Sequence, residues 1–333
     1  MTEGRISVAA GAKVNPRLVI HGRRADGFHE LTTLMLGLDL VDEVTVELVA
    51  GTPRAGERAP ITVTSRGPFA SPDISTDETN LAARGARAAL QALGREDVAL
   101  LIELEKRIPS RAGLGGGSAD AAAAALATLQ LLQPDRGVAV DAAVTESLGR
   151  IGADCAFFFA ARHHGAALSS GRGEAVEPIA ADPPWHVALL TPAIDCATPA
   201  VYGALGLEPK SAAELRAAAE PRGAEVRPAD LFSATASPAR ALLLNDLEAA
   251  AIRAFPALGE WRALFEGVGH GHFLLAGSGS SFFGLFDEAV EAASALEALR
   301  GAAAERSLAF RHASVHRPAG EHLLRVLHSP DRP

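Results

Sequence analysis

The sequence predicts a mixed α+β protein that folds as two lobes. Its 333 residues are enough for two domains, or for one domain with two lobes. Apolar residues make up 48% of the chain, so a large core can be buried without disulfides or metals. Aromatic residues are only 5%, and alanine and leucine dominate instead, which favours helices packed on sheets over an all-β sandwich.

The first half of the chain alternates strand and helix patterns. A helix is predicted over Asn80–Leu93, where apolar residues have helical spacing and Gly94 provides a C-terminal stop. Another is predicted over Ser118–Gln133, with Ser118 as its cap and Pro134 at its end. The other elements predicted here are strands Arg5–Ala10, Arg17–Ile20, Val44–Val49 and Val98–Leu104, and helix Val140–Ile151.

A proline-containing segment, Ala180–Pro184, marks the expected boundary between the lobes. Beyond it, predicted strands Phe273–Ala276 and Phe282–Phe286 flank a second glycine-serine turn. The other elements predicted there are strand Val187–Thr191 and helices Ser211–Ala219, Leu242–Phe255 and Glu288–Leu299. The division expected is an N-terminal domain over residues 1–180, a C-terminal domain over 181–315, and a loosely ordered tail over 316–333.

The charge of the chain argues against nucleic acid as a partner. The net charge is −9, and lysine and arginine form no long run, whereas proteins that follow a phosphate backbone concentrate positive charge. An acidic protein can still bind ATP, provided that backbone N–H groups, a helix terminus and Mg²⁺ meet the phosphates.

Cysteine content and the N-terminal sequence predict a cytoplasmic protein. Cys155 and Cys196 are too few for a disulfide framework or a four-thiolate zinc site, so a reducing compartment is the simpler setting. Met1–Ala12 lacks the basic start and continuous apolar stretch of a signal peptide. Ala121–Leu132 is the most apolar stretch nearby, but it is too short and too rich in alanine to cross a bilayer, so no membrane partner is expected.

A glycine-rich loop at a strand-to-helix junction is the clearest functional signal. Four glycines within Gly113–Gly117 let the backbone turn tightly and point its N–H groups at one concavity that suits an anion. The helix that follows adds free N–H groups and roughly half a positive charge from its dipole. Ser118 is placed to reach Mg²⁺ or a phosphate oxygen, and Asp120 is a further candidate metal ligand.

Two better-known phosphate motifs do not fit this loop. A P-loop needs a lysine directly after the glycines, and none follows them. The dinucleotide fingerprint needs a third glycine where Ser118 stands. A flexible glycine turn with a serine cap, without any ligand, is the structural alternative.

The segment from Pro109 to Asp120 resembles the ATP-binding signature of the GHMP kinases, which include galactokinase, homoserine kinase, mevalonate kinase and phosphomevalonate kinase. Three further segments resemble other motifs of that family in the same order: Ala12–Asn15, Ile151–Phe158 and Ala276–Phe283. The resemblance implies a two-lobed fold, with an N-terminal α/β sandwich that carries an unusual βαβ phosphate loop and a C-terminal ferredoxin-like lobe. It also implies that the protein uses ATP and Mg²⁺.

The resemblance assigns the nucleotide site to two glycine-rich loops and makes Ser118 the implied metal ligand. The residues that it implies for nucleotide binding are Pro109, Ser110, Arg111, Ala112, Gly113, Leu114, Gly115, Gly116, Gly117, Ser118, Ala119, Asp120, Gly277, Ser278 and Gly279.

The same resemblance implies that Lys13 and Asp154 are the catalytic pair. Asp154 is expected to orient or deprotonate the acceptor hydroxyl, while Lys13 keeps it ionised, because a cation within about 4–6 Å favours a charged carboxylate. A purely structural Lys–Asp pair is the alternative.

Gly22–Leu31 closely resembles the substrate loop of those GHMP kinases that phosphorylate a cytidine diphosphate-linked polyol in isoprenoid precursor synthesis. The expected partners are therefore small molecules, ATP and that polyol, and the expected assembly is a monomer or weak homodimer. Phe28, where the family usually has tyrosine, and Tyr202 are implied to stack on cytosine, unless both are ordinary core or rim aromatics. The substrate-binding residues implied are Asn15, Asp26, Phe28, His29 and Tyr202.

Two other functions remain open at this point. Another GHMP kinase would act on a sugar, homoserine or mevalonate, and would have no use for the segment Asp26–His29, which a base-binding site explains. A nucleotide-binding protein without transfer chemistry would tolerate loss of Lys13 and Asp154, both of which are present.

Overall fold

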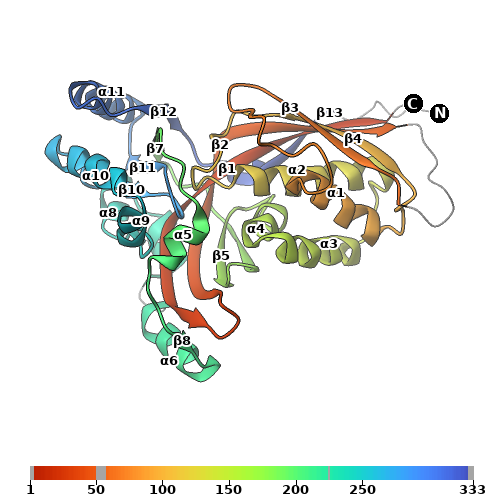
Figure 1. Cartoon of the computed structure of the whole chain (residues 1–333), viewed down its shortest axis with the longest axis horizontal. Helices are drawn as coiled ribbons and strands as arrows, with labels where there is room; N and C mark the ends of the chain where they lie inside the picture. The colour runs from red at the N-terminus through yellow and green to blue at the C-terminus, as the bar shows by residue number, and fades with distance from the viewer. Residues whose placement is uncertain (1–3, 50–57, 224–225, 329–333) are drawn as a thin grey trace.

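A computed structural model describes residues 4–49, 58–223 and 226–328 of the chain. Two β-sheets lie at opposite ends of the molecule, each with helices packed on it (Figure 1). This is the mixed α+β architecture that the sequence predicts. None of the helices in the described ranges is long and apolar enough to span a bilayer.

Two long antiparallel strands, β1 (Arg5–Arg24) and β2 (His29–Val49), form the centre of the larger sheet. β1 contains both short strands predicted near the N-terminus, and β2 ends with the strand predicted over 44–49. The prediction of separate short strands is wrong because register shifts after Gly11 and Val14 break the alternation of side chains along β1.

The other strands of the larger sheet come from distant parts of the chain: β3 (Ile61–Arg66), β4 (Ala99–Glu105), β5 (Gly165–Gly171), β6 (Ala175–Ala180), β8 (Pro209–Lys210), β9 (Leu244–Asn245) and β13 (Leu324–His328). The order is β13-β1-β2-β4-β3, while β5 pairs with β2 and β6, and β8 and β9 each pair with β1. The larger sheet therefore receives strands from both halves of the chain.

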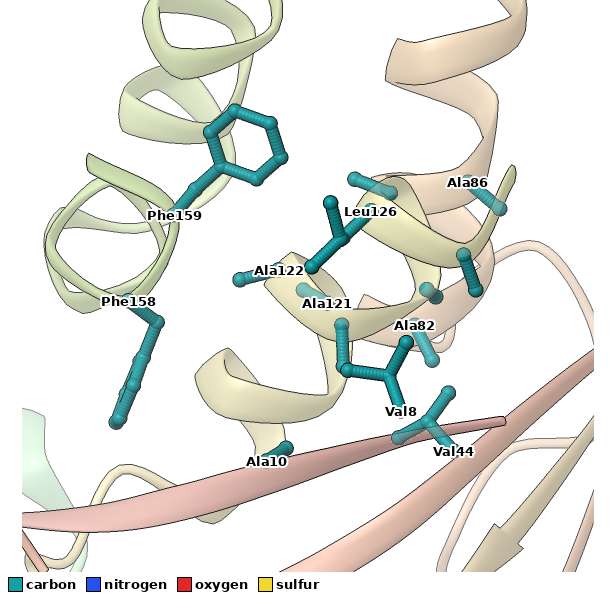
Figure 2. Packing of buried hydrophobic residues seen from close by; sticks show 14 of the residues in the cluster. Val8, Ala10, Val44, Ala82, Ala86, Ala121, Ala122, Leu126, Phe158 and Phe159 are labelled. Atoms are coloured by element: carbon teal, nitrogen blue, oxygen red, sulfur yellow. The ribbon is translucent and has the colours of Figure 1, made fainter. Parts of the chain in front are cut away.

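One face of the larger sheet is covered by helices, namely α1 (Leu81–Ala92), α2 (Gly116–Leu132), α3 (Val138–Ile151) and α4 (Ala153–Ala160) (Figure 1). Figure 2 shows Ala122 and Leu126 of α2 beside Phe158 and Phe159 of α4, above Val8 and Val44 of the sheet, with Ala82 and Ala86 of α1 on the other side of α2. Gly85 lets α1 and α2 come very close, since a Cβ there would lie 2.0 Å from the Ala121 carbonyl oxygen, and the alanines around it add little bulk. The alanine-rich composition thus serves tight helix packing.

The smaller sheet contains β7 (His186–Pro192), β10 (Leu274–Leu275), β11 (Phe282–Phe286) and β12 (Phe310–His316). Its order is β10-β11-β7-β12, and all neighbours are antiparallel. Helices α9 (Glu248–Ala254) and α10 (Ala257–Gly267) precede β10, and α11 (Ala289–Glu305) connects β11 to β12. This β-α-β-β-α-β arrangement is the ferredoxin-like lobe that the resemblance implies.

Shorter helices lie between these elements: α5 (Thr198–Gly203), α6 (Ala212–Gly223), α7 (Pro228–Phe232), α8 (Ala236–Arg240) and the 3₁₀ helix η1 (Gly320–His322). The helix predicted over Leu242–Phe255 begins only at Glu248, because Leu244 and Asn245 pair with β1 as β9. A helix pattern there is overridden by a long-range strand contact.

The expectation of a loosely ordered tail over 316–333 is wrong for the residues described there. Leu323 and Leu324 are buried, and β13 pairs with the outer edge of β1. Residues 329–333 lie outside the described ranges. The chain passes from the larger to the smaller sheet between Ala180 and His186, near the predicted boundary, but the division into 1–180 and 181–315 stays a prediction.

Candidate active site

A cleft of about 1290 Å³ collects most of the residues that the sequence singles out. It is lined by β1, β2, the glycine-rich loop, α4, α5 and the turn between β10 and β11. The singled-out residues that line it are Lys13, Asn15, Phe28, His29, Pro109, Ser110, Arg111, Ala112, Gly113, Leu114, Gly115, Gly116, Gly117, Ser118, Asp120, Asp154, Tyr202, Gly277 and Ser278. Three others, Asp26, Ala119 and Gly279, are not part of the lining.

The glycine-rich loop connects β4 to α2 and requires glycine at two positions. Gly113 and Gly115 have φ of 76° and 74°, a left-handed conformation that favours glycine. A Cβ at Gly113 would lie 2.0 Å from the Ala276 carbonyl oxygen, and one at Gly115 would lie 2.9 Å from the Phe158 ring. Backbone strain and the close approach of neighbours therefore both exclude side chains here.

Helix α2 begins two residues earlier than predicted, and Ser118 is not its cap. Gly115 is the N-cap, without a side-chain hydrogen bond, and Ser118 lies in the first turn. The first intrahelical bond runs from Ala119 N to Gly115 O at 2.9 Å, so the N–H groups of residues 116–118 have no acceptor inside the helix. These donors and the helix dipole favour an anion at this helix entrance.

The three motif segments hold one another in place through backbone hydrogen bonds. Lys13 N donates to Leu114 O at 2.9 Å, and Ser281 N donates to Ala112 O at 3.1 Å. The glycine-rich loop is thus fixed between β1 on one side and the turn before β11 on the other. Segments that are more than 260 positions apart in sequence meet at one place, as Lys13 and Gly277 illustrate: a Cβ at Gly277 would lie 3.1 Å from Lys13 Nζ.

Lys13 and Asp154 form an ion pair in the lining of the cleft. Lys13 Nζ lies 3.3 Å from Asp154 Oδ2, and the side chain of Lys13 is 5% exposed against 32% for Asp154. Lys13 Nζ also donates to Asn15 Oδ1 at 2.8 Å, and Asn15 Nδ2 donates to Thr33 Oγ1 at 2.9 Å. Lys13 is therefore buried and held in place by Asn15, whereas the Asp154 carboxylate, on the first turn of α4, is accessible from the cleft.

Asp120 is buried behind the glycine-rich loop with an oxygen that lacks a partner. Its Oδ2 accepts a hydrogen bond from Lys106 Nζ, whereas Oδ1 has no hydrogen-bond partner among the described residues. Burial raises the pKa of Asp120 to about 7, against the opposing effect of the Lys106 charge. An unpartnered buried oxygen close to the Ser118 turn fits a cation bound with the phosphates.

Metal binding here would depend on the nucleotide as well as the protein. The described residues contain no grouping of three or more His, Cys, Asp or Glu side chains suited to a metal ion. Ser118 and Asp120 offer oxygen ligands, which Mg²⁺ prefers, and Mg²⁺ usually combines one or two protein ligands with phosphate oxygens and water. The donor set fits such an ion and does not fit a metal site made by protein alone.

A second part of the cleft is aromatic. The ring centroids of His29 and Tyr202 lie 5.0 Å apart, and Phe28 is 52% exposed. His29 Nε2 is buried without a hydrogen-bond partner among the described residues, and burial, with the Arg23 charge, lowers the pKa of His29. Burial and the nearby Asp154 carboxylate raise the pKa of Tyr202. His29, whose Nε2 has no partner among the described residues, thus lines the same cleft as the Lys13–Asp154 pair.

Comparison with known proteins identifies the family. The model for the GHMP kinases N terminal domain matches residues 80–162, and that for GHMP kinases C terminal matches residues 231–305. A 4-diphosphocytidyl-2-C-methyl-D-erythritol kinase of Geobacter metallireducens is 33% identical over 294 residues, which cover 88% of this chain and 94% of that protein. A kinase of the same name from Thermus thermophilus is 37% identical over 292 residues, which cover 87% of this chain and 91% of that protein. The chain belongs to the GHMP kinase family.

Solved structures confirm the predicted GHMP kinase fold. A crystal structure of 4-(cytidine 5'-diphospho)-2C-methyl-D-erythritol kinase has a TM-score of 0.63 and 32% identity, and the match covers 93% of this chain and 99% of that one. A homoserine kinase of Cytophaga hutchinsonii has a TM-score of 0.70, with 98% of each chain covered. Its identity is only 20%, so the latter similarity concerns the fold alone.

Asp26, which the resemblance implies as a substrate ligand, lies in the turn between β1 and β2 and outside the main cleft. Its Oδ1 accepts a hydrogen bond from Phe28 N at 3.1 Å, and its Oδ2 lies 3.1 Å from Arg24. These contacts shape the turn that presents Phe28. The placement gives Asp26 a structural position, so a direct substrate contact stays a prediction.

Three residues that support this GHMP kinase site, namely Asp42, Lys106 and Asn245, were given no role from the sequence. Asp42 accepts hydrogen bonds from Lys106 Nζ and, through Oδ1, from Ile108 N at 2.8 Å, which fixes the start of the glycine-rich loop. Asn245 Nδ2 donates to the carbonyl oxygens of Leu275 and Gly277, each at 2.8 Å, and so fixes the turn after β10. Buried polar side chains with many partners are a signal for such roles, but sequence alone does not reveal burial.

Proposed function

We propose that this chain transfers the γ-phosphoryl group of ATP to a hydroxyl group of 4-(cytidine 5'-diphospho)-2-C-methyl-D-erythritol, in the methylerythritol phosphate route to isoprenoid precursors. The observation that carries the proposal is the position of the Lys13–Asp154 pair in one cleft, with a phosphate-binding loop and the His29–Tyr202 rings. The identities of 33% and 37% to kinases of that name support the choice of acceptor.

Nucleotide binding is assigned to the glycine-rich loop and the turn after β10. The phosphates would bind at the N–H groups of residues 116–118, where a side chain at Gly113 or Gly115 cannot fit. Arg111 is exposed at the rim of the same loop and adds a positive charge there. Positioning and charge stabilisation are the main protein contributions that phosphoryl transfer needs.

Transfer itself is assigned to Lys13 and Asp154. Asp154 is accessible from the cleft and accepts the proton of the acceptor hydroxyl or orients it for attack on the γ-phosphorus. The proton moves to an Asp154 carboxylate oxygen as the new P–O bond forms and the bond to ADP breaks. Lys13, buried and fixed by Asn15, stabilises negative charge on the hydroxyl oxygen and on Asp154.

Mg²⁺ would be held by the Ser118 hydroxyl, and Asp120 Oδ1, which has no partner among the described residues, would offer a second protein oxygen. When bound, Mg²⁺ neutralises charge on the phosphate oxygens. The hydrogen bond from Lys106 Nζ to Asp120 Oδ2 fixes the Asp120 carboxylate next to the glycine-rich loop.

Recognition of the base is assigned to the aromatic part of the cleft. His29 Nε2 supplies a buried nitrogen for hydrogen bonding with cytosine, and Phe28 and Tyr202 supply faces for stacking. Asn15 lies beside Lys13, where it would meet the polyol. We also assign the reaction to the cytoplasm, since Cys155 and Cys196 are both free thiols, and we expect a monomer or weak homodimer.

An ADP-release assay with three separate acceptors tests the proposal: the cytidine diphosphate-linked polyol, homoserine and mevalonate. We expect ATP consumption that depends on the cytidylyl acceptor and is at background with the other two. Turnover with homoserine or mevalonate instead would assign the protein to another GHMP kinase activity. ATP binding without turnover on any acceptor would favour a binding protein.

A further inference from the structure

We propose that Arg172 binds the diphosphate bridge of the acceptor and thereby sets the preference for a cytidylyl diphosphate over a plain nucleoside. The inference rests on the proposed function and adds a specificity-determining residue to it. Arg172 lines the same cleft as Asp154 and His29, on the turn between β5 and β6.

The position of this turn carries the first part of the argument. Gly171 at the end of β5 is paired with Leu31 of β2, two residues beyond His29. On the other side, a Cβ at Gly173 would lie 3.2 Å from Cβ of Ala153, which directly precedes Asp154. Arg172 therefore lies between the end of the cleft assigned to the base and the end assigned to the acceptor hydroxyl. The diphosphate joins those two ends of the substrate.

The side chain of Arg172 is held in place on the cleft side. Its guanidinium carbon lies 4.6 Å from the centroid of the Phe28 ring, a cation–π distance. Its backbone N–H donates to Glu174 Oε2 at 2.6 Å, and φ values of 74° and 108° at Gly171 and Gly173 shape the turn. Stacking on a ring leaves the edges of a planar guanidinium free to donate hydrogen bonds.

The charges around Arg172 leave it able to bind an anion. Within the described residues its one ion pair joins Nε to Glu174 Oε1 at 3.5 Å, and Arg172 is 31% exposed. Burial acts to raise the pKa of Asp26, but the Phe28 amide, Arg24 and, to a smaller extent, the Arg172 charge together lower it, so Arg172 lies close enough to Asp26 to influence it. Guanidinium offers five N–H donors, and a diphosphate is the ligand that uses several of them at once.

Binding of CDP and of cytidine, measured by calorimetry on the full chain with a non-hydrolysable ATP analogue and Mg²⁺ in excess, tests this assignment. The analogue keeps CDP out of the ATP site. We expect Arg172→Gln to weaken CDP binding roughly tenfold to a hundredfold, the range for a lost charged hydrogen bond, and to change cytidine binding less than about twofold. Arg172→Lys should restore part of the CDP affinity, because it returns the charge without the planar fork.

Arg150→Gln is the matched control. Arg150 also lines the cleft, but its guanidinium is engaged by Glu146 and Ser147, so its loss should leave the affinity for CDP as in wild type. An equal loss of CDP and cytidine affinity in Arg172→Gln would overturn the role of Arg172, and so would CDP binding that this change leaves as in wild type. In either case, CDP binding by the wild-type protein would still uphold the proposed function. A loss of CDP affinity in Arg23→Gln but not in Arg172→Gln would assign the diphosphate to Arg23, which also lines the cleft, and would overturn the role of Arg172 too. A wild-type protein that binds neither ligand would overturn the proposed function itself.

Discussion

Lys13 Nζ lies 3.3 Å from Asp154 Oδ2, although the two residues come from the first strand and the fourth helix of the chain. The contact depends on glycine between them: a Cβ at Gly115 would lie 2.9 Å from the Phe158 ring of the same helix and 3.1 Å from Lys13 Cγ. The glycine-rich loop thus has two effects at once. It leaves N–H groups free for an anion, and it lets β1 and α4 approach until their charged side chains meet.

Asp154→Asn should retain ATP binding and lose activity, because the amide keeps the shape of the side chain but cannot accept the proton. We expect kcat to fall by about 10²–10⁴. Nucleotide titration and single-turnover rates separate binding from transfer. Asp230→Asn is the control, since Asp230 is an exposed carboxylate on α7 that pairs with Arg227. Wild-type turnover in Asp154→Asn would leave the Lys13–Asp154 contact as a structural pair.

Gly113→Ala should destabilise the glycine-rich loop far more than a Gly→Ala change at a glycine with open space around it. Gly94→Ala is the matched control, because Gly94 has φ of 65° but a Cβ added there would meet nothing within 4 Å. Left-handed strain alone costs about 1–2 kcal/mol. Gly113→Ala adds a contact of 2.0 Å with Ala276 O, so we expect a total of about 2–5 kcal/mol in urea unfolding and weaker ATP binding. Equal losses in the two variants would show that the contact with Ala276 relaxes freely.

Lys106→Met should destabilise the protein strongly, because it leaves Asp42 and Asp120 buried without their shared cation. Burial works against the Lys106 charge, yet the two carboxylates outweigh it and raise the pKa of Lys106. Removing one partner of a buried pair costs about 3–5 kcal/mol. Arg66→Met, which breaks an exposed pair with Glu105, should cost less than about 1 kcal/mol. Urea unfolding compares the two, and similar losses would contradict the inference that Lys106 is a central support of the loop.

The sequence predicts the parts of this site that depend on local backbone geometry. Gly113, Gly115 and Gly277 occupy positive φ, and the need for glycine at such positions is visible in a short motif. The strand before α2 and the helix itself are predicted for the same reason, since periodicity and turn residues lie next to one another. The first helical residue is off by two because Gly115, not Ser118, makes the cap.

Long-range contacts could not be predicted in the same way. Lys106 and Asp42 are 64 positions apart, and their pairing depends on the register of β2 against β4. β13 pairs with β1 although its segment is short and follows a polar stretch. The reason is that Leu323 and Leu324 are buried in the apolar core of the larger sheet. A single sequence shows that these residues are charged or apolar, but it does not show which distant partner covers them.

Phe28→Leu should weaken the use of the cytidylyl acceptor more than the use of ATP. An exposure of 52% is high for a phenylalanine side chain, and stacking on a base is worth about 1–3 kcal/mol. We expect KM for the acceptor to rise about tenfold, with KM for ATP changed less than about twofold. Phe310→Leu, at an exposed position on β12, is the control. A rise of both KM values by the same factor would mean that Phe28 shapes the cleft and does not stack on the base.

Stability should fall as the pH is lowered from about 6.5 towards 4, in part through His272. Burial, with the charges of Arg240 and His270, lowers the pKa of His272 to about 4, and its Nε2 has no hydrogen-bond partner among the described residues. Between that value and the ordinary one near 6.5, the unfolded chain binds a proton that the folded chain does not, so unfolding is favoured as pH falls. Above pH 6.5 both states are neutral there and the effect is absent.

His272→Gln isolates this contribution, because glutamine does not titrate while other groups in the chain still do. The free energy of unfolding of wild type relative to this variant should be constant above pH 6.5 and decrease towards pH 4. We expect a change of about 1 kcal/mol, less than a fully buried group would give, because the ring is partly solvated. Urea unfolding at pH 7.5, 6 and 5 measures the difference. Parallel curves for the two proteins would mean that His272 takes up its proton as readily in the folded chain as in the unfolded one, and that the surrounding rings of Phe273 and Phe286 do not keep it neutral.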